Sequence, residues 1–393
     1  MKLSVKEIKR LLLDFHARRG YQIFESFPLI TDDPTVMFTN ATITPFKSWF
    51  TDPGAAPCNF ALVQRCFRAG GSGNMDEIGH NPNAHAFFEM FGTGTFGIDH
   101  VAATEHLFEM LGSIGIDKKN FFFTVPPGGE FQVGLEANGI PSSRIFTIEE
   151  NGAFWCKWQF GKNGLTGRGL TAIYASGDES ANVVDCLAEE NRGFVELLNL
   201  IHIYGQQNQD GTIGSIANPG FEIGMGVERV ATILQDCDGF QIDNMKPLVE
   251  IVGVYLSTST SDFAARACTE YLRSICILLE EGLFPSNKKA GYVLRKIIRR
   301  FMEHTWLIVG KAVFVEDLIK EFICMMNSRD PSMHISEFSV IDSLRKEHAL
   351  LEQTLERGIK IIQKDPDISQ EILLDTYGLS PSLVQLIKRG EAS

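Results

Sequence analysis

The sequence predicts an α+β protein whose first part mixes strands with helices and whose second part is all-helical. Two apolar, β-rich runs, residues 60–68 and 86–90, enclose a segment rich in glycine, serine and asparagine, which is typical of antiparallel strands joined by a long flexible loop. From residue 236 onward, apolar residues recur almost throughout at helical spacing. Because 393 residues are many for one core, we expect two domains, 1–238 and 239–393.

Taken in order, the first part alternates between the two kinds of pattern. Ser4 is a typical N-cap for the first helix, and Gly92-Thr93-Gly94 predicts a turn after the second β-rich run. The remaining predicted elements are helices at 5–16, 99–111 and 131–139, a short helix or turn at 38–50, strands at 21–30, 120–125 and 144–148, and a strand followed by a helix within 221–234.

The second part contains helical patterns alone, and no strand is expected there. The predicted helices are 245–256, 261–281, 291–304, 315–326, 335–364 and 381–389.

Composition narrows the class of protein. Hydrophobic residues make up 44% of the chain and charged residues 22%, which is ordinary for a soluble globular protein. No apolar run approaches the roughly 20 residues of a membrane helix, and the start lacks a cleavage-site pattern, so we expect a cytoplasmic location. Eight scattered cysteines without a Cys-x-x-Cys argue against a zinc site and against a disulfide framework.

A net charge of −13 disfavours binding to nucleic acid at long range, but charge is distributed unevenly. Residues 288–300 contain six basic side chains and no acidic one. Within the predicted helix, Arg295 and Arg299 are four residues apart and share a face. Taken alone, this pattern favours an ordinary solvated face over a phosphate-binding one.

Residues 60–91 also have the chemistry of a nucleotide site. Arg68 ends the first predicted strand and Phe88 lies on the second, so a guanidinium and an aromatic ring flank the glycine-rich segment. Arginine binds phosphate through two parallel hydrogen bonds, and an aromatic ring stacks on a base. A β-hairpin with a core phenylalanine pair and a surface arginine explains this stretch equally well.

Five groups of residues, in the same chain order, resemble the motifs of alanyl-tRNA synthetases, a family of class II synthetases. They are Asp33-Pro34-Thr35 with Phe38-Thr39-Asn40-Ala41, Arg68-Ala69-Gly70-Gly71 with Phe87-Phe88-Glu89-Met90, Gly224-Met225-Gly226-Val227-Glu228-Arg229, Pro285-Ser286-Asn287 with Gly291-Tyr292-Val293-Leu294-Arg295, and Asp375-Thr376-Tyr377-Gly378. They extend over nearly the whole chain.

The resemblance implies the class II antiparallel sheet flanked by helices, followed by a helical domain that binds a tRNA acceptor stem. It implies an aminoacyl-tRNA ligase that uses ATP and Mg²⁺, with no metal site made by the protein alone. Arg68, Glu89 and Arg229 would be catalytic, and Phe88 and Glu228 would complete the ATP site. We expect the Arg68 and Arg229 guanidinium groups to meet around one triphosphate.

The resemblance also assigns the two other substrates. The amino-acid pocket would contain Trp155, Asn199, Glu222 and Gly224. An alanine-type tRNA would be bound by Asn287, Lys288, Arg295, Arg299 and Asp375. The positions of Asn287 and Asp375 are those with which the family recognises a G·U pair. Without the resemblance, Trp155 would be an ordinary core residue, Asn287 a helix cap and Asp375 a turn residue.

The chain departs from the family pattern mainly around the amino acid. Glu222 stands where the family has an aspartate that binds the α-amino group, and one extra methylene shifts a carboxylate by about 1.5 Å. In the nucleotide region, Ser72, Gly73 and Asn83 replace basic residues. The loop after Trp155 differs as well, so the acyl substrate and the strength of ATP activation are both put in question.

Three hypotheses follow from these matches and departures. The first is a ligase that charges an alanine-type tRNA with alanine or another small acid, including a non-alanine acyl group for a biosynthetic pathway. The second is a tRNA-independent adenylate-forming ligase, and the third is a non-catalytic tRNA-binding protein. The family's editing and C-terminal dimerisation domains have no counterpart in this sequence, from which we expect a monomer.

Overall fold

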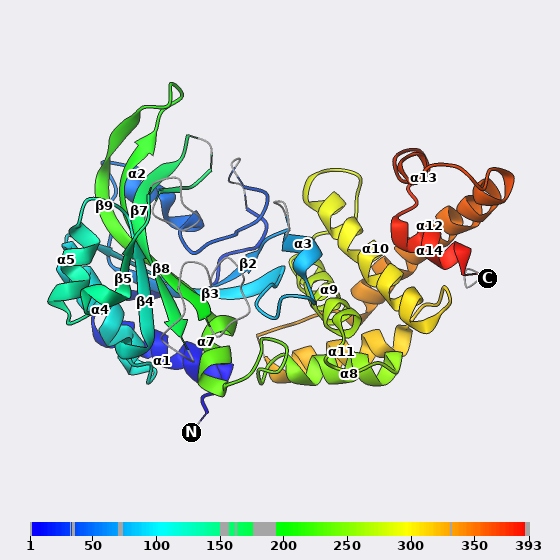
Figure 1. Ribbon diagram of the computed structural model, residues 1–393, viewed down its shortest axis with the longest axis horizontal. Coiled ribbons are helices and arrows are strands. Elements are labelled where there is room, and N and C mark those ends of the chain that lie inside the picture. The colour runs from blue at the N-terminus through cyan, green and yellow to red at the C-terminus, as the bar shows by residue number, and fades with distance from the viewer. Residues whose placement is uncertain are drawn as a thin grey trace. The chain divides into compact units, whose positions relative to one another are not determined.

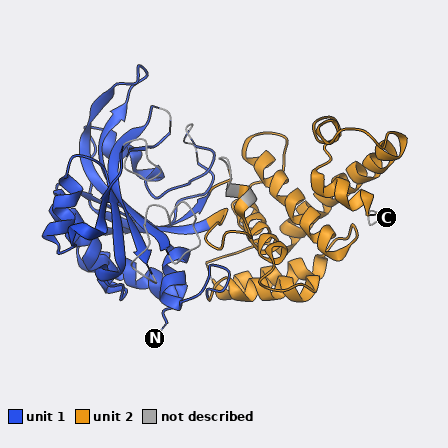
Figure 2. Cartoon of the chain, viewed as in Figure 1, with its two compact units in different colours: residues 1–67, 88–242 blue, residues 68–87, 243–393 orange. Residues whose placement is uncertain are grey.

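The computed structural model describes residues 2–31, 33, 36–69, 74–149, 157–161, 163–175, 194–330 and 332–389. The chain divides into two compact units, shown in Figure 2. Unit 1 consists of Met1–Phe67 and Phe88–Ile242, and unit 2 of Arg68–Phe87 and Asp243–Ser393. The division in the second half of the chain lies four residues beyond the expected boundary, and the short segment 68–87 groups with the helical part.

The described strands of unit 1 form one sheet of nine (Figure 1). The order along its main path is β1, β2, β3, β9, β8, β7, β4, β5, and β6 pairs with β7. The bounds are β1 Gln22–Phe24, β2 Phe60–Phe67, β3 Phe87–Phe96, β4 Phe121–Val125, β5 Ile145–Thr147, β6 Trp158–Gln159, β7 Leu165–Ala175, β8 Phe194–Gln207 and β9 Ile213–Gly226.

The expected α+β architecture is confirmed, with two changes in the sheet. Its centre, β3, β9, β8, β7 and β4, is antiparallel, whereas β1 pairs with β2 and β4 with β5 in parallel. The expected strand at 21–30 shortens to β1. Strands β7 and β8 were not predicted, because glycines interrupt the β-rich pattern of β7.

Gly92 and Gly94 lie inside β3, so the predicted turn at this position is wrong. A Cβ atom on Gly92 would lie 2.3 Å from the Thr42 side chain, and one on Gly94 would lie 2.1 Å from the Phe60 ring. Glycine serves here to admit close neighbours above a strand rather than to reverse the chain.

Helices of unit 1 cover one face of the sheet. They are α1 Val5–Arg18, α4 His100–Ser113, α5 Glu130–Ala137 and α7 Val227–Gln235, whereas α2 Lys47–Thr51, with the short turn η1 Thr44–Phe46 before it, lies on the opposite face. The predicted N-cap is confirmed, since Ser4 and Glu7 form a reciprocal capping box at the start of α1. His16 of α1 contacts Phe91 of β3 with ring centroids 5.2 Å apart, and His100 of α4 lies 4.9 Å from Phe221 of β9.

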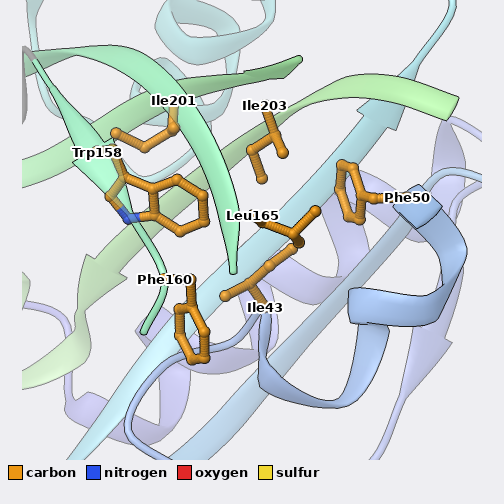
Figure 3. Packing of buried hydrophobic residues seen from close by; sticks show 7 residues of the cluster. All are labelled: Ile43, Phe50, Trp158, Phe160, Leu165, Ile201 and Ile203. Carbon is orange, nitrogen blue, oxygen red and sulfur yellow. The ribbon is translucent and has the colours of Figure 1, made fainter. Parts of the chain in front are cut away.

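Part of the opposite face is covered by the segment that leads into α2. Ile43 and Phe50 pack there against Ile201 and Ile203 of β8 and Leu165 of β7 (Figure 3). Trp158 and Phe160 complete this cluster. Because residues of one strand that are two apart share a face, Asn199 lies on the same face as this cluster, beside its edge.

Unit 2 is helical in its described part, as predicted. Its helices are α3 Asn74–Glu77, α8 Lys246–Leu256, α9 Phe263–Glu280, α10 Lys289–Val309, α11 Glu316–Arg329, α12 Glu337–Lys364, α13 Gln370–Tyr377 and α14 Pro381–Lys388. Helix α13 was not predicted, since its apolar residues Ile372, Leu373 and Leu374 are consecutive and do not recur at helical spacing. Among the described helices of the whole chain, none is both long and apolar enough to cross a membrane.

Two buried histidines make the stability of unit 1 sensitive to acid. His16 Nε2 lies 3.0 Å from His106 Nε2, and burial lowers the pKa of His16 to about 3 and that of His106 to about 4. In the unfolded chain each group titrates near 6.5, so the unfolded state binds more protons between these values. Stability is therefore present above pH of about 6.5 and is lost as pH falls toward the folded values.

We predict that lowering the pH from 7 to 5 decreases the free energy of unfolding by about 2 kcal/mol for each of these two histidines. Urea unfolding followed by tryptophan fluorescence measures this, since three of the four tryptophans belong to unit 1. The variant His106→Phe preserves the ring that stacks on Tyr21 and should flatten the pH dependence. His334→Gln, at an exposed histidine, is the control, and an unchanged slope in His106→Phe would contradict the prediction.

Candidate functional site

The face of the sheet opposite α1 and α4 carries a row of small and polar residues. Thr171 of β7 pairs with Asn199 of β8, which pairs with Gly224 of β9, which pairs with Gly92 of β3. Directly opposed residues in antiparallel strands project from the same face, so these four share it. Two polar side chains thus stand beside two positions that have no side chain at all.

The carboxylate of Glu222 closes the glycine side of this row. Glu222 is 6% exposed, and its Oε1 accepts a hydrogen bond of 2.5 Å from the Thr42 hydroxyl. Thr42 itself lies directly on Gly92, as the 2.3 Å approach shows. A buried carboxylate requires such partners, and the missing side chain at Gly92 allows this one to come close.

Asn199 is held from two sides. Its Oδ1 accepts from the Thr171 hydroxyl at 2.7 Å, and its Nδ2 donates to Glu196 Oε1 at 3.1 Å. Residues three apart on a regular strand project from opposite faces, but the pairing of Ala172 with Leu198 and Ile173 with Glu196 leaves one extra β8 residue, a β-bulge. The bulge brings Glu196 beside Asn199, and the second Nδ2 hydrogen has no partner among the described residues.

Arg229 lies in the first turn of α7, and its side chain extends back over the end of β9. Its Nη1 donates to the Glu196 carbonyl at 2.8 Å, and a Cβ at Gly226 would lie 3.7 Å from its Cγ. Glu196 therefore contacts both Asn199 and Arg229. Of the five N–H groups of a guanidinium, one has a partner among the residues that the structure describes.

The neighbouring residues Glu228 and Glu89 are engaged with one another. Glu228, 3% exposed at the second position of α7, accepts the backbone N–H of Glu89 at 3.1 Å and 3.2 Å. The Glu89 carboxylate forms an ion pair with Lys9 of α1, at 2.8 Å and 2.9 Å. Through the Glu89 N–H, Glu228 connects β3 to the start of α7. Its negative charge is also electrostatically favourable near the helix N-terminus.

The structure brings together some of the predicted residues and separates others. Asn199, Glu222, Gly224 and Arg229, with Glu89 and Glu228, all belong to unit 1, where Phe88 is half-buried in β3. Arg68 follows β2 and groups with unit 2, so its predicted meeting with Arg229 stays a prediction. Trp155, Ser72 and Gly73 lie outside the described residues.

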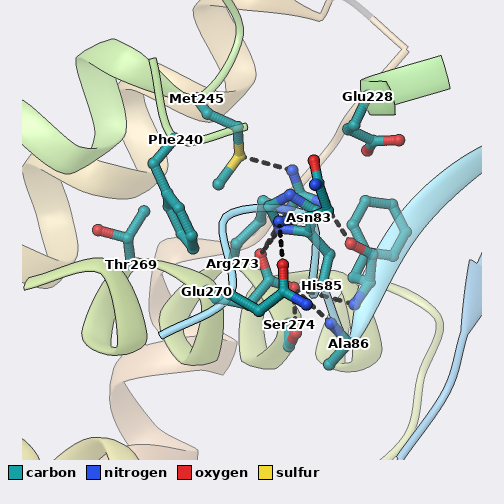
Figure 4. Close-up of polar contacts among 12 residues, drawn as sticks. Asn83, His85, Ala86, Glu228, Phe240, Met245, Thr269, Glu270, Arg273 and Ser274 are labelled. Atoms are coloured by element: carbon teal, nitrogen blue, oxygen red, sulfur yellow. Dashed lines mark hydrogen bonds and ion pairs between the residues drawn. The ribbon is translucent and has the colours of Figure 1, made fainter. Parts of the chain in front are cut away.

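The segment before β3 is fastened to unit 2 by one buried carboxylate (Figure 4). Glu270 of α9 is 0% exposed and accepts the backbone N–H groups of Ala86 at 2.9 Å and Phe87 at 3.0 Å. His85 Nδ1 and Arg273 Nε approach the same carboxylate at 3.1 Å and 3.6 Å. Burial alone would raise the pKa of Glu270, but Arg273, His85 and the backbone N–H of Phe87 outweigh it and lower the pKa.

The same segment makes further contacts within unit 2. The Met75 carbonyl accepts from Arg300 Nη1 at 2.9 Å, and His80 stacks on Phe263 with centroids 3.7 Å apart. At the strand end, the Arg68 N–H donates to the Ala86 carbonyl at 2.9 Å. The described part of the predicted loop, residues 74–85, therefore contacts helices α9 and α10.

The basic run on α10 is less exposed than its sequence suggests. Lys288, Lys289 and Lys296 are exposed, whereas Arg295 and Arg299 are half-buried. Arg295 forms a salt bridge of 2.8 Å with Glu347 of α12 and also donates to Asn287 Oδ1. Asn287 is exposed just before α10, and Asp375 is exposed in the last turn of α13 rather than in a turn between helices.

Sequence reasoning missed several residues that shape these sites. Thr42, Thr171, Glu196 and Lys9 each contact a predicted site residue, and Glu347 fixes Arg295 from a distant helix. Glu270 binds residues 85–87, which precede the predicted Phe88. The repeated glycines at 92 and 94 and at 224 and 226 were the available signal, because alternate glycines in β-rich runs indicate a close approach to the strand. The partners Glu196, Glu270 and Glu347 carry no local signal.

Comparison with known proteins gives consistent similarities. A model of the family described as tRNA synthetases class II (A) matches residues 7–392. The alanine–tRNA ligase of Parvibaculum lavamentivorans is 30% identical over 405 residues, covering 97% of this chain and 45% of that protein. That of Haemophilus influenzae (strain PittGG) is 32% identical over 404 residues, covering 95% and 46%. The chain thus spans about half the length of these relatives.

Among solved structures, an asparaginyl-tRNA synthetase from Entamoeba histolytica aligns with 60% of this chain and 64% of its own. The TM-score is 0.37 and the sequence identity 11%, so this likeness carries no argument about function.

We predict opposite tolerances to substitution at Gly92 and Gly224, on the face of the sheet opposite α1 and α4. Gly92→Ala would place a methyl group 2.3 Å from Thr42 and should destabilise the protein by roughly 1–3 kcal/mol. Gly224→Ala meets Met90 Sδ at 3.5 Å and Glu222 Oε1 at 3.9 Å, which are ordinary contacts, and should fold with little change. Thermal unfolding of both variants measures the difference, and equal losses would refute this description of the face.

Loss of the Glu270 carboxylate should weaken unit 2 markedly. Glu270→Ala leaves Arg273 as a buried charge without its counter-ion and should cost about 3–5 kcal/mol. Glu270→Gln, which retains an acceptor for the two backbone N–H groups, should cost less. Urea unfolding followed by circular dichroism gives these values, while hydrogen exchange of the Ala86 and Phe87 amides shows whether this contact is the cause. Unchanged protection in Glu270→Ala would contradict the assignment.

Proposed function

Because the chain belongs to the family of class II tRNA synthetases, we propose that it is an ATP-dependent aminoacyl-tRNA ligase. It would activate alanine or another small amino acid as an adenylate and transfer it to an alanine-type tRNA. The similarity to alanine–tRNA ligases over nearly the whole chain supports this choice among the class II activities.

The observation that carries the proposal is the buried carboxylate of Glu222 beside Gly224, a position without a side chain. Gly224 leaves room above its strand, Thr42 fills the space above Gly92 and bounds that room, and Glu222 supplies a negative charge beside it. A small molecule with a positive amine fits such a site, whereas a long side chain would meet Thr42 or the cluster around Ile201. Asn199, with its remaining N–H, would orient the carboxylate of the substrate.

The proposed chemistry has two steps. A carboxylate oxygen of the amino acid attacks the α-phosphorus of ATP, and the bond to the bridging oxygen breaks with release of pyrophosphate. A ribose hydroxyl of the terminal adenosine then attacks the acyl carbon, and AMP leaves. Neither step needs a nucleophile from the protein, so the protein acts by positioning and by neutralising charge.

Four side chains suit that role. Arg229 retains N–H groups for phosphate after its bond to the Glu196 carbonyl, and Arg68 is assigned the same role on the ATP side. Phe88 would stack on adenine. Mg²⁺ prefers oxygen donors, which Glu89 offers if it exchanges its partner Lys9, and the ion would neutralise phosphate charge when bound with ATP.

Unit 2 would hold the acceptor stem. Lys288 is exposed and free to approach phosphates, and Asn287 and Asp375 present an amide and a carboxylate at the surface. Short polar side chains reach base edges in the shallow minor groove of RNA, so this pair suits base recognition.

The lengthened carboxylate favours testing substrates other than alanine. In ATP–pyrophosphate exchange across small amino acids and carboxylic acids, we expect exchange with at least one small amino acid, followed by charging of alanine tRNA. Exchange without charging would indicate a tRNA-independent ligase, and absence of exchange with every acid would leave only a tRNA-binding role.

Arg229 provides a residue-level test of the same proposal. Arg229→Ala should lower the exchange rate by about 100-fold or more, because a charge that stabilises the transition state is lost. Arg144→Ala, at a half-buried arginine elsewhere in unit 1, is the matched control and should retain exchange. Similar rates in Arg229→Ala and the parent would refute a catalytic role.

A further inference from the structure

The side-chain amide of Asn287 has a defined orientation. Its Oδ1 accepts a hydrogen bond from Arg295 Nη1. A guanidinium can only donate, so the carbonyl oxygen of Asn287 must face it and the NH₂ group must face away. Since Asn287 is exposed, the group offered at the surface is a hydrogen-bond donor.

Arg295 is itself fixed by a buried carboxylate. Its Nε lies 3.0 Å from both oxygens of Glu347, and its Nη2 lies 2.8 Å from Oε1. The Glu347 side chain is 4% exposed and that of Arg295 is 19% exposed. A planar guanidinium held at two nitrogens has one orientation, so the nitrogen that meets Asn287 is not free to swing toward a phosphate.

The backbone of the turn is equally constrained. The Ser286 N–H donates to the Gly291 carbonyl at 3.0 Å, and the Ser286 hydroxyl donates to the Lys288 carbonyl at 3.1 Å. A Cβ at Gly291 would lie 2.3 Å from Ser286 Oγ, so the turn closes tightly on the first turn of α10. Lys289 adopts a left-handed φ of 48°, a strained conformation that persists only where its surroundings enforce it.

We propose that Glu347 and Arg295 are positioning residues that lock Asn287 as a hydrogen-bond donor toward the acceptor stem. This inference rests on the proposed tRNA-binding role of unit 2. It changes the role of Arg295 from a direct phosphate contact to an indirect determinant of specificity.

The chemistry of base pairs gives this orientation a consequence. In the minor groove, pyrimidine O2 and purine N3 are acceptors, and the amino group of guanine is the donor. A locked NH₂ group forms hydrogen bonds with the acceptors but not with the guanine amino group, because both of these groups are donors. An amide free to rotate could instead turn its carbonyl oxygen toward the guanine amino group, and it would not discriminate between the two. The carboxylate of Asp375 has the complementary preference, since it can only accept.

Phosphate contacts would be made by other side chains. Lys288, Lys289 and Lys296 are exposed around the same turn and the first turns of α10. Contacts to phosphates add affinity without sequence preference. Loss of such a contact should therefore weaken binding to all hairpins, whereas loss of the fixed Asn287 orientation should reduce the discrimination between hairpins.

The test compares binding of short acceptor-stem hairpins whose base pairs differ only in minor-groove donors and acceptors. Glu347→Gln and Arg295→Lys should reduce the discrimination between hairpins by roughly tenfold or more. Glu347→Gln removes the charge that fixes the guanidinium, and Arg295→Lys cannot contact Glu347 and Asn287 with one planar group. Asn287→Asp, which can still accept from Arg295 but presents no donor, should lose the preference for acceptors. Lys296→Gln, the matched control, should weaken binding to all hairpins alike and reduce its salt dependence.

A second measurement needs no RNA. In isotope-labelled protein, the side-chain NH₂ of Asn287 should be rigid by nuclear magnetic resonance relaxation in the parent and mobile in Glu347→Gln. Equal mobility in both proteins, or full discrimination retained by Glu347→Gln, overturns the inference. If the parent binds no hairpin, the proposed tRNA-binding role fails, and the mobility of Asn287 still decides whether the lock exists.

Discussion

The architecture of unit 1 depends on the strict alternation of side chains along its central strands. On β3 and β9, one set of alternate residues, including Phe91 and Phe221, is covered by α1 and α4. The other set contains the glycines, together with Glu222. Because a slip of one residue in register would exchange the two sets, the apolar contacts with the helices also fix the position of the polar face. Packing on one side of the sheet thereby specifies the site on the other.

Buried carboxylates form the second constraint, and each joins segments that are far apart in the chain. Glu222 accepts from Thr42, Glu270 holds residues 85–87, and Glu347 holds Arg295. A charge removed from water requires partners of good geometry, and breaking such a pair is far more costly than losing one at the surface. These ties are therefore well suited to place functional groups rather than merely to add stability.

Much of the fold was predictable from local pattern. The capping box at Ser4, strand β2 and most helices of unit 2 follow from signals within a few residues, and the structure confirms them with boundary shifts. Strands β7 and β8 and helix α13 were missed, because glycines obscure the strand pattern of β7 and the apolar residues of α13 are consecutive rather than at helical spacing. The glycines that misled the prediction at 92 and 94 are the positions at which Thr42 and Phe60 pack directly on β3.

The sequence by itself determined which chemical groups the chain contains and in what order, and that order was enough to indicate its family. Tertiary structure decided which of those groups are exposed. Arg295 and Lys296 are neighbours of equal charge, yet one is paired with a buried carboxylate and the other is in solvent. The physical reason is that the free energy of a charge depends on its partners and solvation, which come from segments more than fifty residues away in this case.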